Sequence, residues 1–178
     1  GKLAMYTTTT GHENTAVGTE ALRLNSTGTY NAVLGFEALY SNTSGVSNTA
    51  IGWKSLYAST TANNNTALGE SALRANTTAS NNTAVGFSAL TSNTTGIRHV
   101  AIGNNSLYSN TTGNYGVAIG YEALKSDASV EESVAVGAFA LQSQTSGRNT
   151  AVGYLAGLDL TTGSYNTLLG GEAGENIT

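Results

Sequence analysis

Residues 82–96 read Asn-Thr-Ala-Val-Gly-Phe-Ser-Ala-Leu-Thr-Ser-Asn-Thr-Thr-Gly, and this stretch is one copy of a repeat that fills the chain. The glycine after the apolar residue recurs as Gly18, Gly35, Gly52, Gly69, Gly86, Gly103, Gly120, Gly137, Gly153 and Gly170. Successive glycines are evenly spaced, except that the step from Gly137 to Gly153 is shorter by a single deletion, which a polar loop can absorb. A short, fixed period of this kind is typical of a solenoid.

Stacked repeats turn each position of the repeat into a column of side chains. The position before the glycine is always Val, Ile or Leu, and we predict that it forms the structural core: Val17, Leu34, Ile51, Leu68, Val85, Ile102, Ile119, Val136, Val152 and Leu169. A Leu column four residues after the glycine runs from Leu22 to Leu141 and gives way to Gly157 and Gly174. Two columns of mostly Ala accompany them, Ala16 to Ala151 and Ala21 to Ala173.

A unit of about 17 residues is too short for a pair of helices, but it accommodates one coil with two or three short strands. We therefore predict an all-β protein, a parallel β-solenoid of ten rungs. Parallel strands stack about 4.8 Å apart, so ten rungs give a rod roughly 45–50 Å long. The array is expected over 14–174, after an N-terminal leading segment at 1–13 and before a truncated end of the array at 175–178.

The composition argues against several classes of protein. Only 7 residues are Lys or Arg and the net charge is −4, whereas nucleic-acid binding requires clustered basic side chains. The chain has no Cys for a disulfide or a thiolate site, and no apolar run long enough to enter a membrane. It also has no Pro, which would remove a hydrogen-bond donor from stacked strands.

The chain has few large apolar side chains for its length. Leu, Ile, Val and Phe together number 35, which is little apolar burial to offset the entropy lost when the whole chain is ordered. The Ala columns offer a second flat face that another chain can approach closely. We therefore expect the protein to associate with copies of itself.

The repeated Asn-Thr-Ala-Val/Ile-Gly segments, with their Thr-Gly corners, resemble the head repeats of trimeric autotransporter adhesins and the repeats of phage tail fibres and related trimeric bacterial fibres. The resemblance covers about Asn14 to Gly174. It implies a left-handed roll, a homotrimer around one axis, and an extracellular location on a cell surface or virion fibre. It also implies a role in host attachment or cell adhesion.

Three functions are therefore compared. The leading prediction is a structural and adhesive fibre segment that contacts a surface glycan or a host-cell receptor. The second is a pure spacer shaft whose binding tip lies elsewhere. The third is a monomeric solenoid that binds ice or glycan on a flat face, suggested by a Thr column that begins with Thr15 and is interrupted by Ala32 and three valines.

The sequence contains little catalytic chemistry. His99 takes the place of an Asn in a repeat column, and His12 lies in the leading segment. Glu20, Glu37, Glu122 and Glu172 share one column, which we interpret as solvent-facing rather than as an acid and base pair. The pair Glu131-Glu132 is interpreted as a solvated loop rather than a cation site. We expect no catalytic residue, metal site or cofactor, and hence no enzyme.

Aromatic and basic side chains form the best candidate contact surface. Tyr, Arg and Lys share the column five residues after the glycine, and Trp53 lies one residue after its glycine. The candidate contacts for a partner or glycan are Tyr40, Trp53, Tyr57, Tyr108, Arg23 and Arg74. Such a surface can stack on sugar rings or hold a partner through cation–π contacts. The alternative is stacking between neighbouring rungs, which stabilises any β-array.

Overall fold

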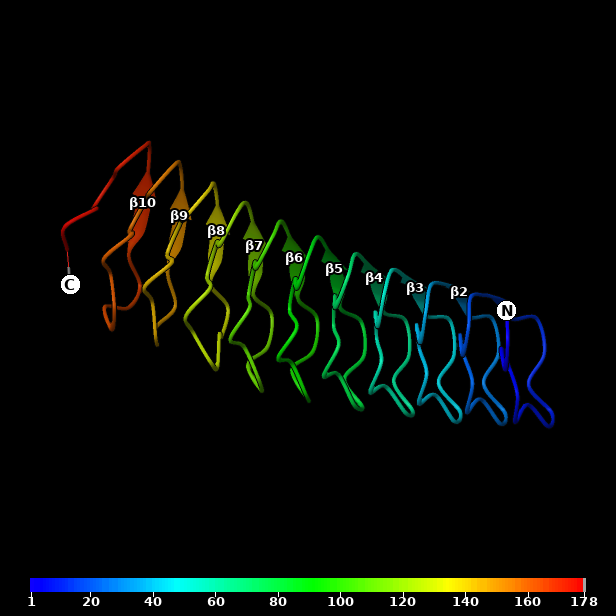
Figure 1. Cartoon of the computed structure of the whole chain (residues 1–178). Helices are drawn as coiled ribbons and strands as arrows, with labels where there is room; N and C mark the ends of the chain where they lie inside the picture. The colour runs from blue at the N-terminus through cyan, green and yellow to red at the C-terminus, as the bar shows by residue number, and fades with distance from the viewer. Residues whose placement is uncertain (178) are drawn as a thin grey trace.

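The protein is an all-β parallel solenoid, seen here in a computed structural model that describes residues 1–177 (Figure 1). The coils stack along one axis, with the N-terminus at one end of the rod and the C-terminus at the other. The ten strands are β1 (Thr15–Val17), β2 (Ala32–Leu34), β3 (Thr49–Ile51), β4 (Thr66–Leu68), β5 (Thr83–Val85), β6 (Val100–Ile102), β7 (Val117–Ile119), β8 (Val134–Val136), β9 (Thr150–Val152) and β10 (Thr167–Leu169). They form one parallel sheet in sequential order, which confirms the predicted fold class.

The sheet register follows the sequence period. Thr49 of β3 lies beside Thr66 of β4, one repeat later, and each strand pairs with the next in the same way. Val134 of β8 lies beside Thr150 of β9, so the register follows the shortened step of the sequence. The Tyr165 N–H donates to the Arg148 carbonyl at 2.7 Å, and Thr150 of β9 is already in register with Thr167 of β10. The missing residue therefore falls in the turn at Arg148. The turn therefore absorbs the deletion, as expected.

The predicted core column was assigned to the wrong face. The residue before the glycine points outward in every strand, with exposed fractions of 53% for Val17, 43% for Leu68 and 38% for Ile102. Of the predicted column, seven are exposed and Ile51, Val85 and Val136 are half-buried: Val17, Leu34, Ile51, Leu68, Val85, Ile102, Ile119, Val136, Val152 and Leu169. The middle residue is buried in β2 to β9, as Ala50 and Ala101 are, and half-buried in the terminal strands β1 and β10.

Alternation of side chains along a strand explains this arrangement. In a three-residue strand, the middle side chain points to one face and its two neighbours point to the other. The Leu column occupies the interior beside the strands, with Leu56 and Leu107 fully buried. The strands therefore present small residues inward, Ala in most rungs and Val33 in β2. The Ala columns are consequently interior walls and not the flat outer face that the sequence suggested.

The Leu column also sets the path of the coil. Each of these leucines has a positive φ, for example 50° at Leu56 and Leu107, a conformation that costs roughly 1–2 kcal/mol for a residue with a Cβ. Two rungs use glycine there instead, with φ of 65° at Gly157 and 66° at Gly174. The lost Leu volume is replaced from the strand side, because β10 carries Leu168 where other strands carry Ala or Val.

The repeated glycine is required where adjacent rungs come closest. Gly52 has a φ of 129°, and a Cβ placed on it would lie 2.5 Å from the carbonyl oxygen of Gly69 in the next rung. A side chain here would push two rungs apart. This contact explains why the glycine spacing is the most regular feature of the sequence.

Residues 1–13 are part of the array and not a separate leading segment. The Met5 N–H donates to the Ala21 carbonyl at 3.1 Å and the Thr7 N–H donates to the Arg23 carbonyl at 3.1 Å, as in later rungs. Residues 171–177 likewise continue the coil, since the Gly157 N–H donates to the Ala173 carbonyl at 2.9 Å. The boundary at 14 is therefore wrong, and Thr178 lies outside the described residues.

The interior holds two ladders of amide side chains beside the apolar columns. In one ladder, Asn48 Nδ2 donates to Asn31 Oδ1 at 3.2 Å, and Asn65 Nδ2 donates to Asn48 Oδ1 at 3.2 Å. In the other, Asn42 Nδ2 donates to Asn25 Oδ1 at 2.8 Å. Both Asn42 and Asn48 also donate to a backbone carbonyl of a turn, which satisfies polar groups that have no access to water.

Candidate binding surface

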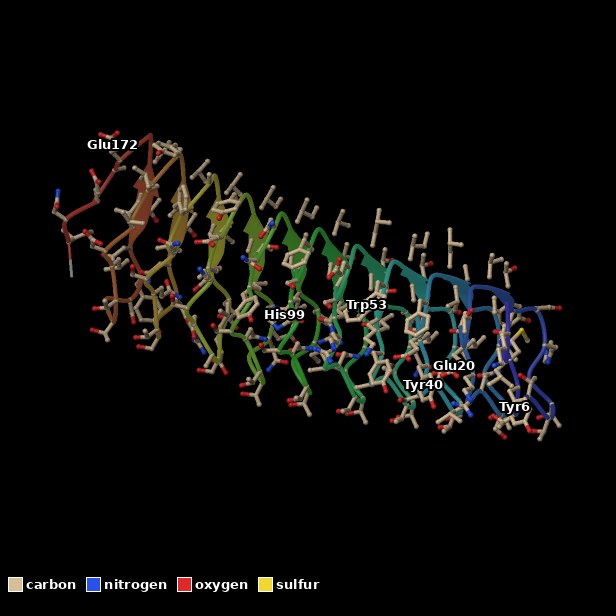
Figure 2. The ribbon with its side chains drawn as sticks, viewed as in Figure 1. Tyr6, Glu20, Tyr40, Trp53, His99 and Glu172 are labelled. Atoms are coloured by element: carbon tan, nitrogen blue, oxygen red, sulfur yellow. The ribbon has the colours of Figure 1, made fainter. Side chains whose placement is uncertain are left out.

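Columns of equivalent residues form distinct surfaces along the rod. Figure 2 shows short side chains without polar atoms along the upper edge of the rod and side chains tipped with oxygen along the lower edge. The residues before the repeated glycines end the strands and point outward. We call these ten residues, Val17 to Leu169 in the column given above, the apolar ridge.

Exposed aromatic side chains flank the apolar ridge on one side. They lie one residue after the repeated glycine and have exposed fractions between 43% and 55%: Phe36, Trp53, Phe87, Tyr121 and Tyr154. Tyr121 and Tyr154 both pack edge-on against Phe139, with ring centroids 5.1 and 6.3 Å apart. The ridge and these rings together form an uncovered apolar strip along the rod.

Paired Ser and Thr columns lie eight and nine residues after the glycine, with Ala128 as an exception in the first column. The first column is used within the rod, since Thr60 Oγ1 donates to the Thr77 carbonyl at 3.2 Å and Thr94 Oγ1 donates to the Thr111 carbonyl at 3.0 Å. The second column is exposed in every rung: Thr27, Ser44, Thr61, Thr78, Thr95, Thr112, Ser129, Ser146 and Thr162. We call this second column the hydroxyl edge.

Most of the predicted contact residues are brought together, but they engage one another. Tyr40 and Tyr57 stack with their ring centroids 5.3 Å apart, and Arg23 lies over the Tyr40 ring while its Nη1 donates to Tyr40 Oη at 2.8 Å. Lys54 Nζ lies 4.7 Å from the centroid of Trp53 and 5.3 Å from that of Tyr57. Stacking between neighbouring rungs, which was the alternative interpretation, therefore accounts for the contacts of these side chains.

Carboxylates compensate the cations in the same cluster. Arg23 Nη1 lies 3.3 Å from Glu20 Oε2, and Lys54 Nζ lies 3.3 Å from Glu37 Oε2. Glu20 and Glu37 are half-buried rather than fully solvent-facing, which corrects the interpretation of their column at these two positions, whereas Glu172 is exposed. An incoming partner would have to displace these interactions.

Glu122 of that column is more enclosed. It is 8% exposed; burial acts to raise its pKa, but the hydrogen bond and charge of Lys125, with Nζ at 2.9 Å, bring that pKa below its ordinary value. Glu122 therefore works as a structural ion pair. Its partner is a cation, whereas acid and base catalysis by two carboxylates would require a second acid beside it.

Tyr108 and Arg74 lie apart from this cluster, beside an open groove of about 520 Å³. The groove, here called the tyrosine groove, is lined by Tyr57, Ala58, Arg74, Ala75, Thr91, Ser92 and Tyr108. Tyr57 therefore belongs to both features: it closes the stacked cluster on one side and borders the groove on the other. The sequence placed these residues in one column, but it did not reveal which of them face open space.

His99 is an interior residue. It is 1% exposed, its Nε2 lies 2.5 Å from the Gly113 carbonyl oxygen, and its Nδ1 accepts the Gly116 N–H at 3.0 Å. Burial lowers its pKa despite these backbone hydrogen bonds. His99 thus replaces the Asn of its ladder, as its position in the repeat predicted. His12, in contrast, is exposed.

Arg148 pairs with both carboxylates of the Glu131-Glu132 loop. Arg148 Nη2 lies 3.0 Å from Glu131 Oε2, and Arg148 Nε lies 3.7 Å from Glu132 Oε2. Within residues 1–177, no three His, Asp or Glu side chains gather in a way that could hold a metal ion. The same residues include no helix long and apolar enough to cross a membrane.

Comparison with protein families, with curated proteins and with solved structures found no match for this chain. We therefore infer the function of the surface from the residues of this chain. Two features of that surface escaped sequence reasoning. The apolar ridge was taken for core, and the tyrosine groove depends on side chains three rungs apart.

Proposed function

We propose that the chain is a non-enzymatic rod segment of an extracellular homotrimeric fibre, in which parallel copies pack through the apolar ridge and other columns face outward for attachment. The observation that carries this proposal is the ridge itself. It presents one Val, Ile or Leu per rung over all ten rungs, with seven of them exposed. Soluble monomers rarely leave a continuous apolar surface of this extent uncovered.

A second copy of the chain is the occupant that fits the ridge best. The ridge is a straight row whose spacing equals the spacing between rungs, about 4.8 Å. A parallel copy presents the same row with the same spacing, also across the shortened sequence step, because Val136 lies beside Val152 in the sheet. An unrelated globular surface would match such a row over a few rungs only. The number of three copies and the left-handed sense come from the resemblance to trimeric fibres.

The attachment role is proposed on the same resemblance and on the exposed aromatic and hydroxyl columns. No buried acid, base and nucleophile cluster competes with it among residues 1–177, where His99 is held inside the rod and Asp127 bonds to the Ser129 N–H and to Gln144 Nε2. A pure spacer shaft shares every structural element of this proposal except the outward contact. The Thr column considered for ice binding is interrupted at Ala32, Val100, Val117 and Val134.

The solution mass, measured by light scattering behind size exclusion, tests the assembly. We expect a mass near three times 18.1 kDa that does not change on dilution. Leu68→Asp and Ile102→Asp should lower the mass, because each places a charge in the ridge. Thr78→Asp and Thr95→Asp, on the exposed hydroxyl edge, are the matched controls and should leave it unchanged. A wild-type protein that runs as a clean monomer would overturn the proposal.

A further inference from the structure

Arg74 is the basic residue of the tyrosine groove, and it differs from the other basic residues of its column because it has no carboxylate partner in the part of the chain that the structure describes. The other cations of the column have carboxylate partners, Arg23 with Glu20 and Lys125 with Glu122. In the rung of Arg74, the position of these glutamates is occupied by Ser71, which is buried. Within residues 1–177, Arg74 forms no ion pair and lies over no aromatic ring, and its side chain is exposed. The groove thus contains an uncompensated positive charge.

Two tyrosines border the groove along the rod axis. Tyr57 stacks on Tyr40 with an interplanar angle of 21°, so one face of its ring is covered and the other faces the rungs of Arg74 and Thr91. Tyr108, which is 39% exposed, borders the groove three rungs further on. Three rung spacings correspond to about 14 Å. The tyrosines are therefore far enough apart to admit a ring between them.

The floor of the groove is small and polar. Ala58, Ala75 and Ser92 leave space above the backbone, and Thr91 and Ser92 provide hydroxyl groups. A volume of about 520 Å³ lies within the range of small-ligand sites, roughly 300–1,000 Å³. Such a floor offers hydrogen bonds to a hydroxylated ligand, and it offers little to an apolar one.

We propose that the tyrosine groove binds a carboxylate-bearing saccharide, such as a uronic acid residue of a surface glycan. Arg74 pairs with the carboxylate, a tyrosine ring stacks on the apolar face of the sugar, and Thr91 and Ser92 hydrogen-bond to its hydroxyl groups. This inference rests on the attachment role proposed above and names the chemistry of the contact. It also moves that contact from the Trp53 neighbourhood, whose cations are paired, to the next three rungs.

The groove stays accessible when the apolar ridge is covered. The groove residues lie five and six positions after the repeated glycine, and the ridge lies one position before it. Tyr40, which shares the column of Tyr57 and Tyr108, is labelled below the middle of the rod in Figure 2, away from the upper edge. Packing through the ridge therefore leaves each copy with its own groove.

The test is a saturation-transfer NMR titration of the whole chain with two matched probes, methyl β-D-glucuronide and methyl β-D-glucoside. They differ by a carboxylate in place of a hydroxymethyl group. We expect the glucuronide to bind about tenfold or more tightly than the glucoside, and to weaken as salt is added. Arg74→Gln should reduce glucuronide binding to the glucoside level, and Tyr108→Ala should weaken both probes.

Arg23→Gln is the matched control, because Arg23 shares the column but is paired with Glu20; it should leave both titrations unchanged. The inference is wrong if the two probes bind equally, if neither binds, or if Arg74→Gln binds glucuronide as well as the wild type does. Circular dichroism of the variants establishes that they fold. The solution mass separates the two proposals: a trimer without saccharide binding overturns only this inference, and a monomer overturns the fibre assembly.

Discussion

The Oδ1 atom of Asn42 and the Oγ atom of Ser59 belong to adjacent rungs of one interior ladder, and neither has a hydrogen-bond partner within residues 1–177. Elsewhere in this ladder the amide of one rung donates to the Oδ1 atom of the rung before it, as Asn93 does to Asn76 at 3.0 Å. Ser59 has no amide to donate and is fully buried. The ladder is therefore broken at one rung.

Ser59→Asn should stabilise the protein by about 1–3 kcal/mol, because a new amide can donate to Asn42 Oδ1 and accept from Asn76 Nδ2, and buried polar atoms without partners cost about this much. Asn76 already occupies the equivalent place in the next rung, where its Nδ2 donates to the Ala79 carbonyl, so the site has a local precedent. Urea denaturation at constant protein concentration measures the change. Ser59→Ala, which removes the buried hydroxyl but leaves Asn42 Oδ1 as it is, is the control. Equal stability of the Asn and Ala variants would contradict the ladder argument.

Adjacent residues of β6 should respond oppositely to a charge. Ala101 is fully buried, so Ala101→Asp places an unpaired carboxylate in the interior and should cost more than about 3 kcal/mol. Ile102 points outward, so Ile102→Asp should keep the β signal in circular dichroism although it weakens assembly. Loss of the β signal in Ile102→Asp but not in Ala101→Asp would reverse the assignment of inner and outer faces.

Stability should fall on mild acidification because of His99. Burial holds the pKa of folded His99 below 6.5, the value for an unfolded chain. Above pH 6.5 the side chain is neutral in both states. Below it, only the unfolded chain takes up the proton, so stability decreases as pH falls from about 6.5 towards the folded pKa, by at most about 1.4 kcal/mol per pH unit. Urea midpoints between pH 7.5 and 5 measure this slope.

The control for the acid effect is His99→Asn, which restores the usual ladder residue and removes the titrating group. Its overall stability can shift, because Gly116 in the next rung is fitted to the larger ring. The slope with pH between 7.5 and 5 is the relevant quantity, and it should flatten. The hydrogen-bond partners of the ring are Gly113, Gly116 and Asn110, whose groups do not titrate. A slope equal to that of the wild type would assign the acid sensitivity to other groups.

Gly157 and Leu168 should behave as a compensating pair. A Cβ on Gly157 would lie 2.8 Å from Leu168 Cδ1 and 2.9 Å from Leu141 Cδ2, so Gly157→Leu alone overfills the interior and should cost about 1–3 kcal/mol. Adding Leu168→Ala recreates the pattern of the earlier rungs and should recover most of that loss. A double-mutant cycle in urea provides the coupling energy. Additive effects of the two substitutions would show that they do not share one space.

The period of the glycines was enough to predict the fold class, the number of strand-bearing rungs and the site of the deletion. The strongest constraint of the fold, the close approach of Gly52 to Gly69, is also the strongest signal in the sequence. The extra coil at residues 1–13 was missed because it has no Asn-Thr-Ala-Val-Gly strand. The backbone hydrogen bonds of Met5 and Thr7 show that this coil is equivalent to later rungs.

The inner and outer faces were not predictable from hydrophobicity. Ala101 and Ile102 are adjacent and both apolar, so the parity of a three-residue strand is set only by what fills the space opposite. The Leu column takes that space, which forces the smaller residue inward. Similarly, the column register placed Arg23 and Arg74 together. Only the side-chain contacts distinguish Arg23, paired with Glu20, from Arg74, which borders the groove.

The identical cross-section of the rungs has a consequence for the gene. Each rung meets its neighbours through the same columns, and the turn at Arg148 shows that even an irregular step leaves the following strand in register. Recombination between repeats in the coding DNA can therefore add or remove whole rungs without creating a new kind of contact. Rod length is expected to vary among descendants of this sequence far more readily than rod thickness, because a thicker coil would require simultaneous changes in every repeat.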